Sequence, residues 1–236
     1  MIITITNQKG GSGKTSTAVL FALALASISK RVLCVDCDPQ AGLTSFLYPD
    51  SEVNESLFDI LTGGSCAPLK IVRHSLEFYL IPADHRLDKI YSTLRPFELE
   101  KAFSKANYDY IIFDTPPTVQ GISLAASIIA DKVFVPADIS RATMNSTLYT
   151  LETLRDIKKI GNVILIGYKE PAPESSSFTA NIARDFIKAI DRNRIGTIKK
   201  SVLMQRAVSD AGLRWTDKRR QEILQPILKL LGVKHG

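Results

Sequence analysis

The chain has 236 residues, of which 45% are hydrophobic and 23% are charged, a balance typical of a folded globular protein rather than a disordered or fibrous one. Its longest apolar run, residues 18–28, is too short to span a bilayer, and its start lacks the charged segment and cleavage site of a secretory signal. Because three cysteines form no even-numbered disulfide framework, we expect a cytoplasmic protein.

Short apolar runs rich in β-branched residues alternate with helical patterns along the chain. The predicted strands are residues 2–6, 32–36, 78–82, 110–114, 132–136, 163–167 and 195–198. The predicted helices are residues 15–29, 97–106, 121–130, 144–159, 179–190 and 217–231. This alternation predicts an α/β fold, a doubly wound and mostly parallel sheet of about seven strands flanked by helices. No long linker divides the chain, so we predict one domain over residues 1–236.

A glycine-rich loop, "TNQKGGSGKTS" at residues 6–16, joins the first strand to the first helix. Its glycines leave room for backbone N–H groups to wrap a phosphate, and the helix that follows points its positive end at the same place. Lys14 supplies a charge near the β- and γ-phosphates, and Thr15 supplies a hydroxyl for Mg²⁺. Gln8 stands where the common G-x-x-x-x-G-K-[ST] loop has glycine, and a second lysine, Lys9, opens the loop.

Aspartates stand at the ends of two other predicted strands. Asp36 and Asp38 follow the second strand in "DCDPQ", and Asp114 ends the apolar strand of "YIIFDTPP". The carboxyl ends of parallel strands meet at one edge of a sheet, so these carboxylates are expected beside the glycine-rich loop, where Asp114 could hold Mg²⁺ through a water. For Asp36 two roles stay open, a part in the Mg²⁺ shell and a structural brace of the loop.

Cys34 and Cys37 have the C-x-x-C spacing of some zinc and redox sites. Residues three apart on a strand point to opposite faces, and no second cysteine pair or nearby histidine completes a ligand set. We therefore expect packed thiols.

Five motifs together resemble the ParA/MinD family of P-loop ATPases, which carry a deviant Walker A loop. They are "KGGSGKTS" (9–16), "DCDPQAGLTS" (36–45), "SLFDILTGG" (56–64), "LIPAD" (80–84) and "FDTPP" (113–117). The resemblance runs from Met1 to about Pro136 and is closest to the ParA/Soj partition branch, in its short type without a preceding helix-turn-helix, as in archaeal chromosome-partition members. It implies ATP and Mg²⁺ as cofactors.

The resemblance also implies residue roles. The nucleotide-binding residues would be Lys9, Gly10, Gly11, Ser12, Gly13, Lys14, Thr15 and Ser16, and the Mg²⁺ site would use Thr15, Asp36 and Asp114. Lys9 would be the signature lysine, which crosses the interface of a nucleotide-dependent homodimer to reach the partner's phosphates. Asp38 would orient the attacking water, so the catalytic set would be Lys9, Lys14 and Asp38. Thr115, Pro116 and Pro117 would form a second switch.

The positive charge of the chain is concentrated at its C-terminal end. Residues 181–236 hold 13 Lys and Arg against 5 Asp and Glu, whereas residues 1–180 hold 17 against 19. Such asymmetry favours an anionic partner, although an isolated basic run is often only a solvated face. We expect non-specific binding of double-stranded DNA, and so association with the nucleoid, through Lys199, Lys200, Arg206, Arg214, Lys218, Arg219 and Arg220. The family resemblance adds a ParB-like centromere-binding protein as the partner that stimulates hydrolysis.

The expected function is therefore an ATP-dependent DNA-segregation switch, and the principal alternative is a MinD-like, membrane-associated positioning ATPase. That alternative depends on residues 217–231, whose apolar side chains fall on one helical face. Closing the core is the simpler role for that face, so a membrane partner is not expected. A metabolic ligase or reductase is a third class, but no cysteine follows Cys66 to hold a cluster.

Overall fold

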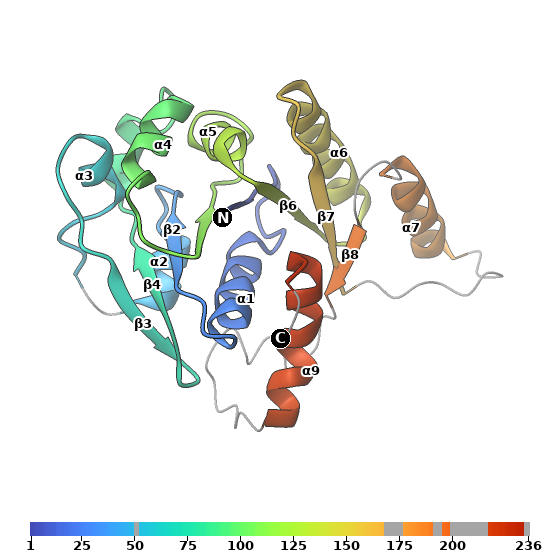
Figure 1. The fold of residues 1–236 in the computed structure, drawn as a ribbon. Coiled ribbons are helices and arrows are strands. Elements are labelled where there is room, and N and C mark those ends of the chain that lie inside the picture. The colour runs from blue at the N-terminus through green and yellow to red at the C-terminus, as the bar shows by residue number, and fades with distance from the viewer. Residues whose placement is uncertain (50–51, 168–176, 191–194, 199–216, 234–236) are drawn as a thin grey trace.

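The computed structural model describes residues 1–49, 52–167, 177–190, 195–198 and 217–233 (Figure 1). Its strands are β1 (Ile2–Ile5), β2 (Val32–Asp36), β3 (Leu69–Arg73), β4 (Leu76–Ile81), β5 (Tyr110–Asp114), β6 (Lys132–Ala137), β7 (Gly161–Ile166) and β8 (Ile195–Ile198). Its helices are α1 (Lys14–Ala26), α2 (Gly42–Leu47), α3 (Leu57–Leu61), the 3-10 helix η1 (His85–Lys89), α4 (Pro96–Phe103), α5 (Ile122–Ile129), α6 (Arg141–Asp156), α7 (Phe178–Ala189) and α9 (Asp217–Leu231).

The described strands form one eight-stranded sheet in the order β3-β4-β2-β5-β1-β6-β7-β8. Only β3 and β4 pair antiparallel, and every other neighbouring pair is parallel. The chain fills one side of β1 up to β5 and then crosses to the other side with β6. The order of the strands therefore reverses at β1, and the crevice beyond its carboxyl end is where ligands bind in such sheets.

Helices cover both faces of the sheet. On one face α1, α2 and α9 pack in a core that includes Phe21, Phe78 and Phe134. On the other face α3, α4 and α5 cover one half of the sheet, and α6 and α7 cover the other half. Because most strands are buried on both faces, they are continuous apolar runs in the sequence. The doubly wound α/β fold predicted from the sequence is confirmed.

Some elements differ from the prediction. The strand β3 was not predicted, because only Ile71 of its five residues is fully buried and charged residues interrupt its apolar pattern. The short elements α2, α3 and η1 were also not predicted. The helix α6 begins at Arg141, three residues earlier than expected, because the Ser140 hydroxyl accepts a hydrogen bond from Thr143 N and caps the helix.

The helix α9 agrees with its prediction at both ends and packs against α1, the helix that follows the glycine-rich loop (Figure 1). Its apolar side chains are almost completely buried in the shared core: Ile223, Leu224, Ile227, Leu228 and Leu231. The ammonium group of Lys132 donates a hydrogen bond to the carbonyl of Leu231 and holds the end of the helix. In this fold α9 closes the core.

Candidate nucleotide-binding site

Three of the predicted site segments meet at the centre of the sheet. The strand β5 lies between β2 and β1, and its last residue, Asp114, is in register with Asp36 of β2 and Ile5 of β1. Both aspartates are buried, with exposed fractions of 2% and 0%. The glycine-rich loop follows β1 directly, so the sheet brings together the loop and the two carboxylates that the sequence predicted as neighbours.

The glycine-rich loop has the backbone that its glycines permit. Gly11 has φ of 71° and Gly13 has φ of 92°, which are left-handed values that side chains rarely allow. A Cβ at Gly13 would also lie 2.5 Å from Ile166 Cδ1, whereas a Cβ at Gly10 or Gly11 would meet nothing within 4 Å. The loop is thus packed at its base and open where its first glycines stand, and Gly13 is the N-cap residue of α1. That geometry fits a phosphate beside the positive end of the helix.

Lys14, the second lysine of the loop, is held inside the protein. Lys14 is only 8% exposed, and its ammonium group donates a long hydrogen bond of 3.4 Å to the carbonyl of Lys9. Burial lowers the pKa of Lys14, against the charges of Asp114 and Asp38, which raise it. A phosphate group in the loop would supply the negative charge that a buried ammonium group needs.

Asp114 fits the Mg²⁺ role that was predicted for it from the sequence. Its Oδ1 oxygen is buried without a hydrogen-bond partner among the described residues. Burial, with the negative charge of Asp36 as the second cause, raises the pKa of Asp114 to about 8, while a hydrogen bond from Thr15 opposes the rise. A divalent cation would favour the charged carboxylate. Asp114 and the Thr15 hydroxyl would hold Mg²⁺, which would screen the phosphate charge during attack by water.

The carboxylate of Asp36 accepts hydrogen bonds from the loop that follows β2 and from Thr44 of α2. Oδ1 accepts a hydrogen bond of 3.1 Å from Asp38 N, and Oδ2 accepts 2.8 Å and 2.7 Å hydrogen bonds from the N and Oγ1 atoms of Thr44. Burial raises its pKa to about 6 in spite of these hydrogen bonds. Of the two roles that the sequence left open for Asp36, the geometry favours the brace. Asp38 is half-buried, and its own Oδ1 accepts a hydrogen bond from Gln40 N.

Lys9 reaches the start of α6 in this single chain. Its ammonium group donates a hydrogen bond to Thr143 Oγ1 and lies 3.7 Å from Asp138 Oδ1, and its side chain is 31% exposed. Partial burial opposes ionisation of Asp138, but hydrogen bonds from Thr143 and Ser140 hold its pKa below the ordinary value. Asp138 follows the end of β6, so the strand-end argument used for Asp36 would also have found it.

The segment before Lys9 is fixed to the same helix. Asn7 Nδ2 donates hydrogen bonds to the carbonyl of Pro136 and to Thr147 Oγ1, and Lys9 N donates to Asn7 Oδ1. Asn7 is 0% exposed, so this anchor lies inside the protein. No motif in the sequence pointed to Thr143 or Thr147 of α6, since their partners lie more than 130 residues away.

Cys34 and Cys37 are both buried but belong to the cores on opposite faces of the sheet, as expected from their spacing. Burial, with the nearby aspartates, raises the pKa of both thiols. They are therefore packed as thiols.

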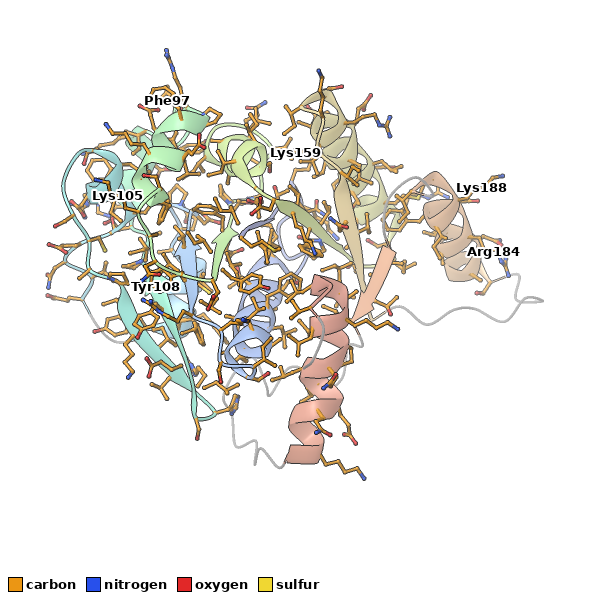
Figure 2. The ribbon with its side chains drawn as sticks, in the orientation of Figure 1. Phe97, Lys105, Tyr108, Lys159, Arg184 and Lys188 are labelled. Carbon is orange, nitrogen blue, oxygen red and sulfur yellow. The ribbon has the colours of Figure 1, made fainter. Side chains whose placement is uncertain are left out.

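The DNA-binding residues expected from the sequence are only partly described. Lys199, Lys200, Arg206 and Arg214 lie outside the described residues. Lys218, Arg219 and Arg220 are in the first turn of α9, where Lys218 is exposed. Two further basic residues of the C-terminal excess, Arg184 and Lys188, are exposed on the outer side of α7 (Figure 2).

Comparison with known proteins places this site in a family. A family model described as an AAA domain matches residues 1–166, which include the loop and all three aspartates. Soj, the sporulation initiation inhibitor protein of Bacillus subtilis, is 36% identical over 174 residues, covering 70% of this chain and 69% of that protein. The chain belongs to the ParA/Soj family of partition ATPases.

Other members agree over similar lengths. The chromosome-partitioning ATPase Soj of Thermus thermophilus is 34% identical over 161 residues, covering 66% of this chain and 62% of that protein. The chain thus spans somewhat less than two thirds of that relative. Among solved structures, the ATP complex of a Cyanothece McdA superposes with a TM-score of 0.82 at 25% identity, covering 100% of this chain and 97% of that one. The Aquifex aeolicus MinC:MinD complex has a TM-score of 0.76 at 22% identity and shows the shared fold.

Proposed function

We propose that this protein is an ATP-dependent DNA-segregation ATPase, in which ATP joins two copies of the chain and the dimer binds DNA without reading its sequence. The observation that carries the proposal is the contrast between the two lysines of the phosphate loop. Lys14 is buried close enough to Asp114 to feel its charge, whereas the side chain of Lys9 is partly exposed. Lys14 suits the phosphates of its own chain, and Lys9 suits phosphates presented by a second copy.

In this mechanism the loop from Gly10 to Ser16 wraps the phosphates with its backbone N–H groups, and Lys14 neutralises them. Thr15 and Asp114 hold Mg²⁺, and Asp38 orients the water that attacks the γ-phosphate. Lys9 leaves Asp138 and crosses to the partner's phosphates, which makes dimerisation depend on ATP. Loss of the γ-phosphate removes part of the charge between the two subunits and loosens the dimer.

DNA binding is proposed to follow from the C-terminal basic excess. Lys218 is exposed at the start of α9, and α9 packs on α1, which begins in the phosphate loop. A change at the nucleotide can thus be transmitted to α9 through the packing of α1 against α9. A partner protein bound to centromere-like DNA would stimulate hydrolysis, by analogy with the family.

The membrane-positioning alternative is less well supported by the described residues. The apolar face of α9 is occupied by the core, with Ile227 at 0% and Leu228 at 1% exposure. An amphipathic helix that binds a bilayer needs such a face free. No helix in the described part of the chain is long and apolar enough to cross a membrane.

The dimer switch can be tested with Lys9→Ala in a background that holds ATP, Asp38→Ala. The Asp38→Ala protein should form dimers with ATP in light scattering, and adding Lys9→Ala should leave it monomeric while ATP still binds. The exposed lysine Lys101 of α4 gives the matched control, Lys101→Ala, which should dimerise normally. A dimer that persists without Lys9 would contradict the in-trans role.

A further inference from the structure

Thr44 joins three separate segments behind the nucleotide-binding loop. From α2, its N and Oγ1 atoms donate hydrogen bonds to Asp36 Oδ2 at the end of β2. The same hydroxyl accepts a 2.9 Å hydrogen bond from Ala83 N, in the segment after β4. Thr44 is 4% exposed, so water does not compete for these bonds. The hydroxyl acts as donor to one segment and acceptor from the other, which a methyl group in its place could not do.

The contacts of Thr44 lead directly to Asp38. Asp36 Oδ2 accepts a hydrogen bond from the Thr44 hydroxyl, and Asp36 Oδ1 accepts one from Asp38 N. The position of the Asp36 carboxylate therefore sets the position of the Asp38 backbone. We propose that Thr44 is a positioning residue for hydrolysis, which holds Asp38 where it can orient the water that attacks the γ-phosphate; the inference rests on the proposed function of Asp38.

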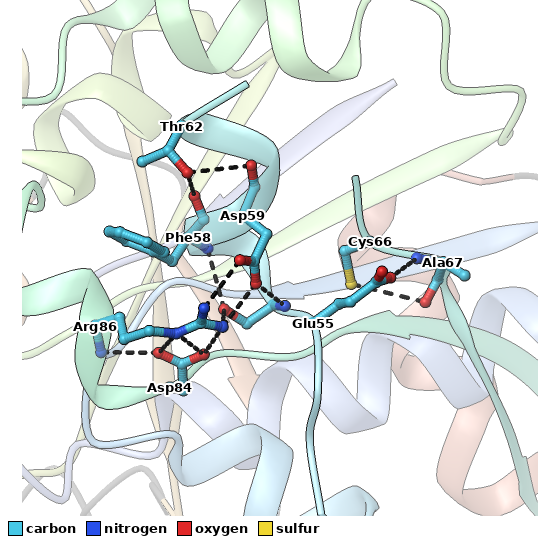
Figure 3. Close-up of polar contacts among 9 residues, drawn as sticks. Glu55, Phe58, Asp59, Thr62, Cys66, Ala67, Asp84 and Arg86 are labelled. Atoms are coloured by element: carbon cyan, nitrogen blue, oxygen red, sulfur yellow. Dashed lines mark hydrogen bonds and ion pairs between the residues drawn. The ribbon is translucent and has the colours of Figure 1, made fainter. Parts of the chain in front are cut away.

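The segment after β4, which contains Ala83, is anchored by neighbouring hydrogen bonds and ion pairs. Next to Ala83, the Asp84 carboxylate accepts hydrogen bonds of 3.1 Å and 2.7 Å from the Nε and Nη2 atoms of Arg86, which also pairs with Asp59 at 2.6 Å (Figure 3). Asp59 in turn accepts a hydrogen bond from Ser56 N and closes the capping box of α3. Ala83 thus belongs to a braced segment, and Thr44 ties the hydrolytic loop to it.

A pocket lies next to the hydrogen bond between Thr44 of α2 and Ala83. A cavity of about 490 Å³ lies beside Thr44 and is bordered by α2 and the segment after β4, including Ser45, Tyr48 and Asp84. Leu43 and Leu47 hold α2 in the core on its other side, whereas the pocket leaves this side of α2 less closely packed. On this side the hydroxyl of Thr44 ties α2 to the segment after β4 by a hydrogen bond.

The test is Thr44→Val, which keeps the branched shape and removes the hydroxyl, compared with Thr44→Ser, which keeps the hydroxyl. Because a misplacement of about 1 Å can cost on the order of 100-fold in rate, we expect kcat of Thr44→Val to fall about 10- to 100-fold. Its affinity for ATP should change less than about 2-fold, since the hydrogen bonds of Thr44 go to Asp36 and Ala83 and not to the phosphate loop, and such a split marks a group needed only in the transition state. Thr44→Ser should stay within about 3-fold of the wild type, since it restores both hydrogen bonds.

A buried hydroxyl elsewhere gives the control for lost stability. Ser127 of α5 is 2% exposed and donates to the carbonyl of Ser123, so Ser127→Ala removes one buried hydrogen bond away from the loop. Single-turnover hydrolysis of all four proteins is measured at 15 °C, with fluorescent-ATP binding in parallel and circular dichroism to check that each protein is folded. Wild-type kcat in Ser127→Ala with a loss in Thr44→Val alone supports the proposal.

Three outcomes would overturn the inference. They are equal rates for Thr44→Val and the wild type, an equal loss in Thr44→Ser, and a loss of ATP affinity as large as the loss of kcat. A wild-type protein that binds ATP without any hydrolysis would instead refute the proposed function itself, and the two failures are thus told apart.

Discussion

The role of α9 gives a quantitative prediction, for the change Ile227→Ala. Ile227 is 0% exposed within the core shared by α1 and α9. Truncating a buried isoleucine to alanine costs about 2–5 kcal/mol, from lost burial and the cavity that remains. Taking about 3 kcal/mol, and a shift of roughly 2–4 °C per kcal/mol for a chain of this size, the melting temperature should fall by about 6–12 °C.

The assay is thermal unfolding followed by circular dichroism, with Gln225→Ala as the control on the exposed side of the same helix. The control should stay within about 2 °C of the wild type, because exposed substitutions usually change stability by less than about 0.5 kcal/mol. If Ile227→Ala were no less stable than Gln225→Ala, the helix would not be closing the core, and the argument against a membrane-binding face would fail.

Two further predictions concern the nucleotide-binding site and the pairing of Arg86 with Asp84. Lys14→Ala should abolish binding of a fluorescent ATP analogue, whereas Asp38→Ala should bind it and release no phosphate, because Lys14 contacts ground-state phosphates and Asp38 is needed only when water attacks; wild-type turnover in Asp38→Ala would show that another residue orients the water. Partial burial raises the pKa of Asp84, but hydrogen bonds from Arg86 bring it down to about 2, so this carboxylate stabilises the fold above its unfolded pKa and the stabilisation is lost as pH falls from about 4 towards 2. In urea unfolding, the free energy of unfolding of the wild type should exceed that of Asp84→Asn by about 1–2 kcal/mol at pH 6, after allowance for solvent screening. This difference in free energy should narrow at pH 3. A difference that does not depend on pH would place the effect outside the Asp84–Arg86 pair.

The sequence predicts the central strands because their burial on both faces leaves an unambiguous signal. β2 and β5 are continuous apolar runs that end in aspartate, and both ends were predicted correctly. The edge strand β3 carries no such signal, because solvent faces much of it and Val72 is 58% exposed. Its place depends on pairing with β4, which a local pattern does not contain.

The candidate site divides in the same way. The loop residues and Asp114 could be placed because each stands in a local motif at a strand end. Thr44 and Thr143 could not, since their roles come from contacts with Ala83 and Lys9, which are 39 and 134 residues away in the sequence. For Asp36 the motif gave the position, while its role as a brace needed the three hydrogen bonds seen in the structure.

The most direct test of the account is the binding of the wild-type protein to double-stranded DNA and to anionic liposomes, each with ATP and with ADP. The account predicts DNA binding with ATP and not with ADP. The affinity should be equal for unrelated DNA sequences, because phosphate contacts carry no base information. About six neutralised phosphates would give a log–log salt slope near −5. Changing Lys218, Arg219 and Arg220 to Glu should weaken binding to every sequence alike and leave basal hydrolysis intact. Salt-insensitive DNA binding, or ATP-dependent capture on anionic liposomes, would contradict it.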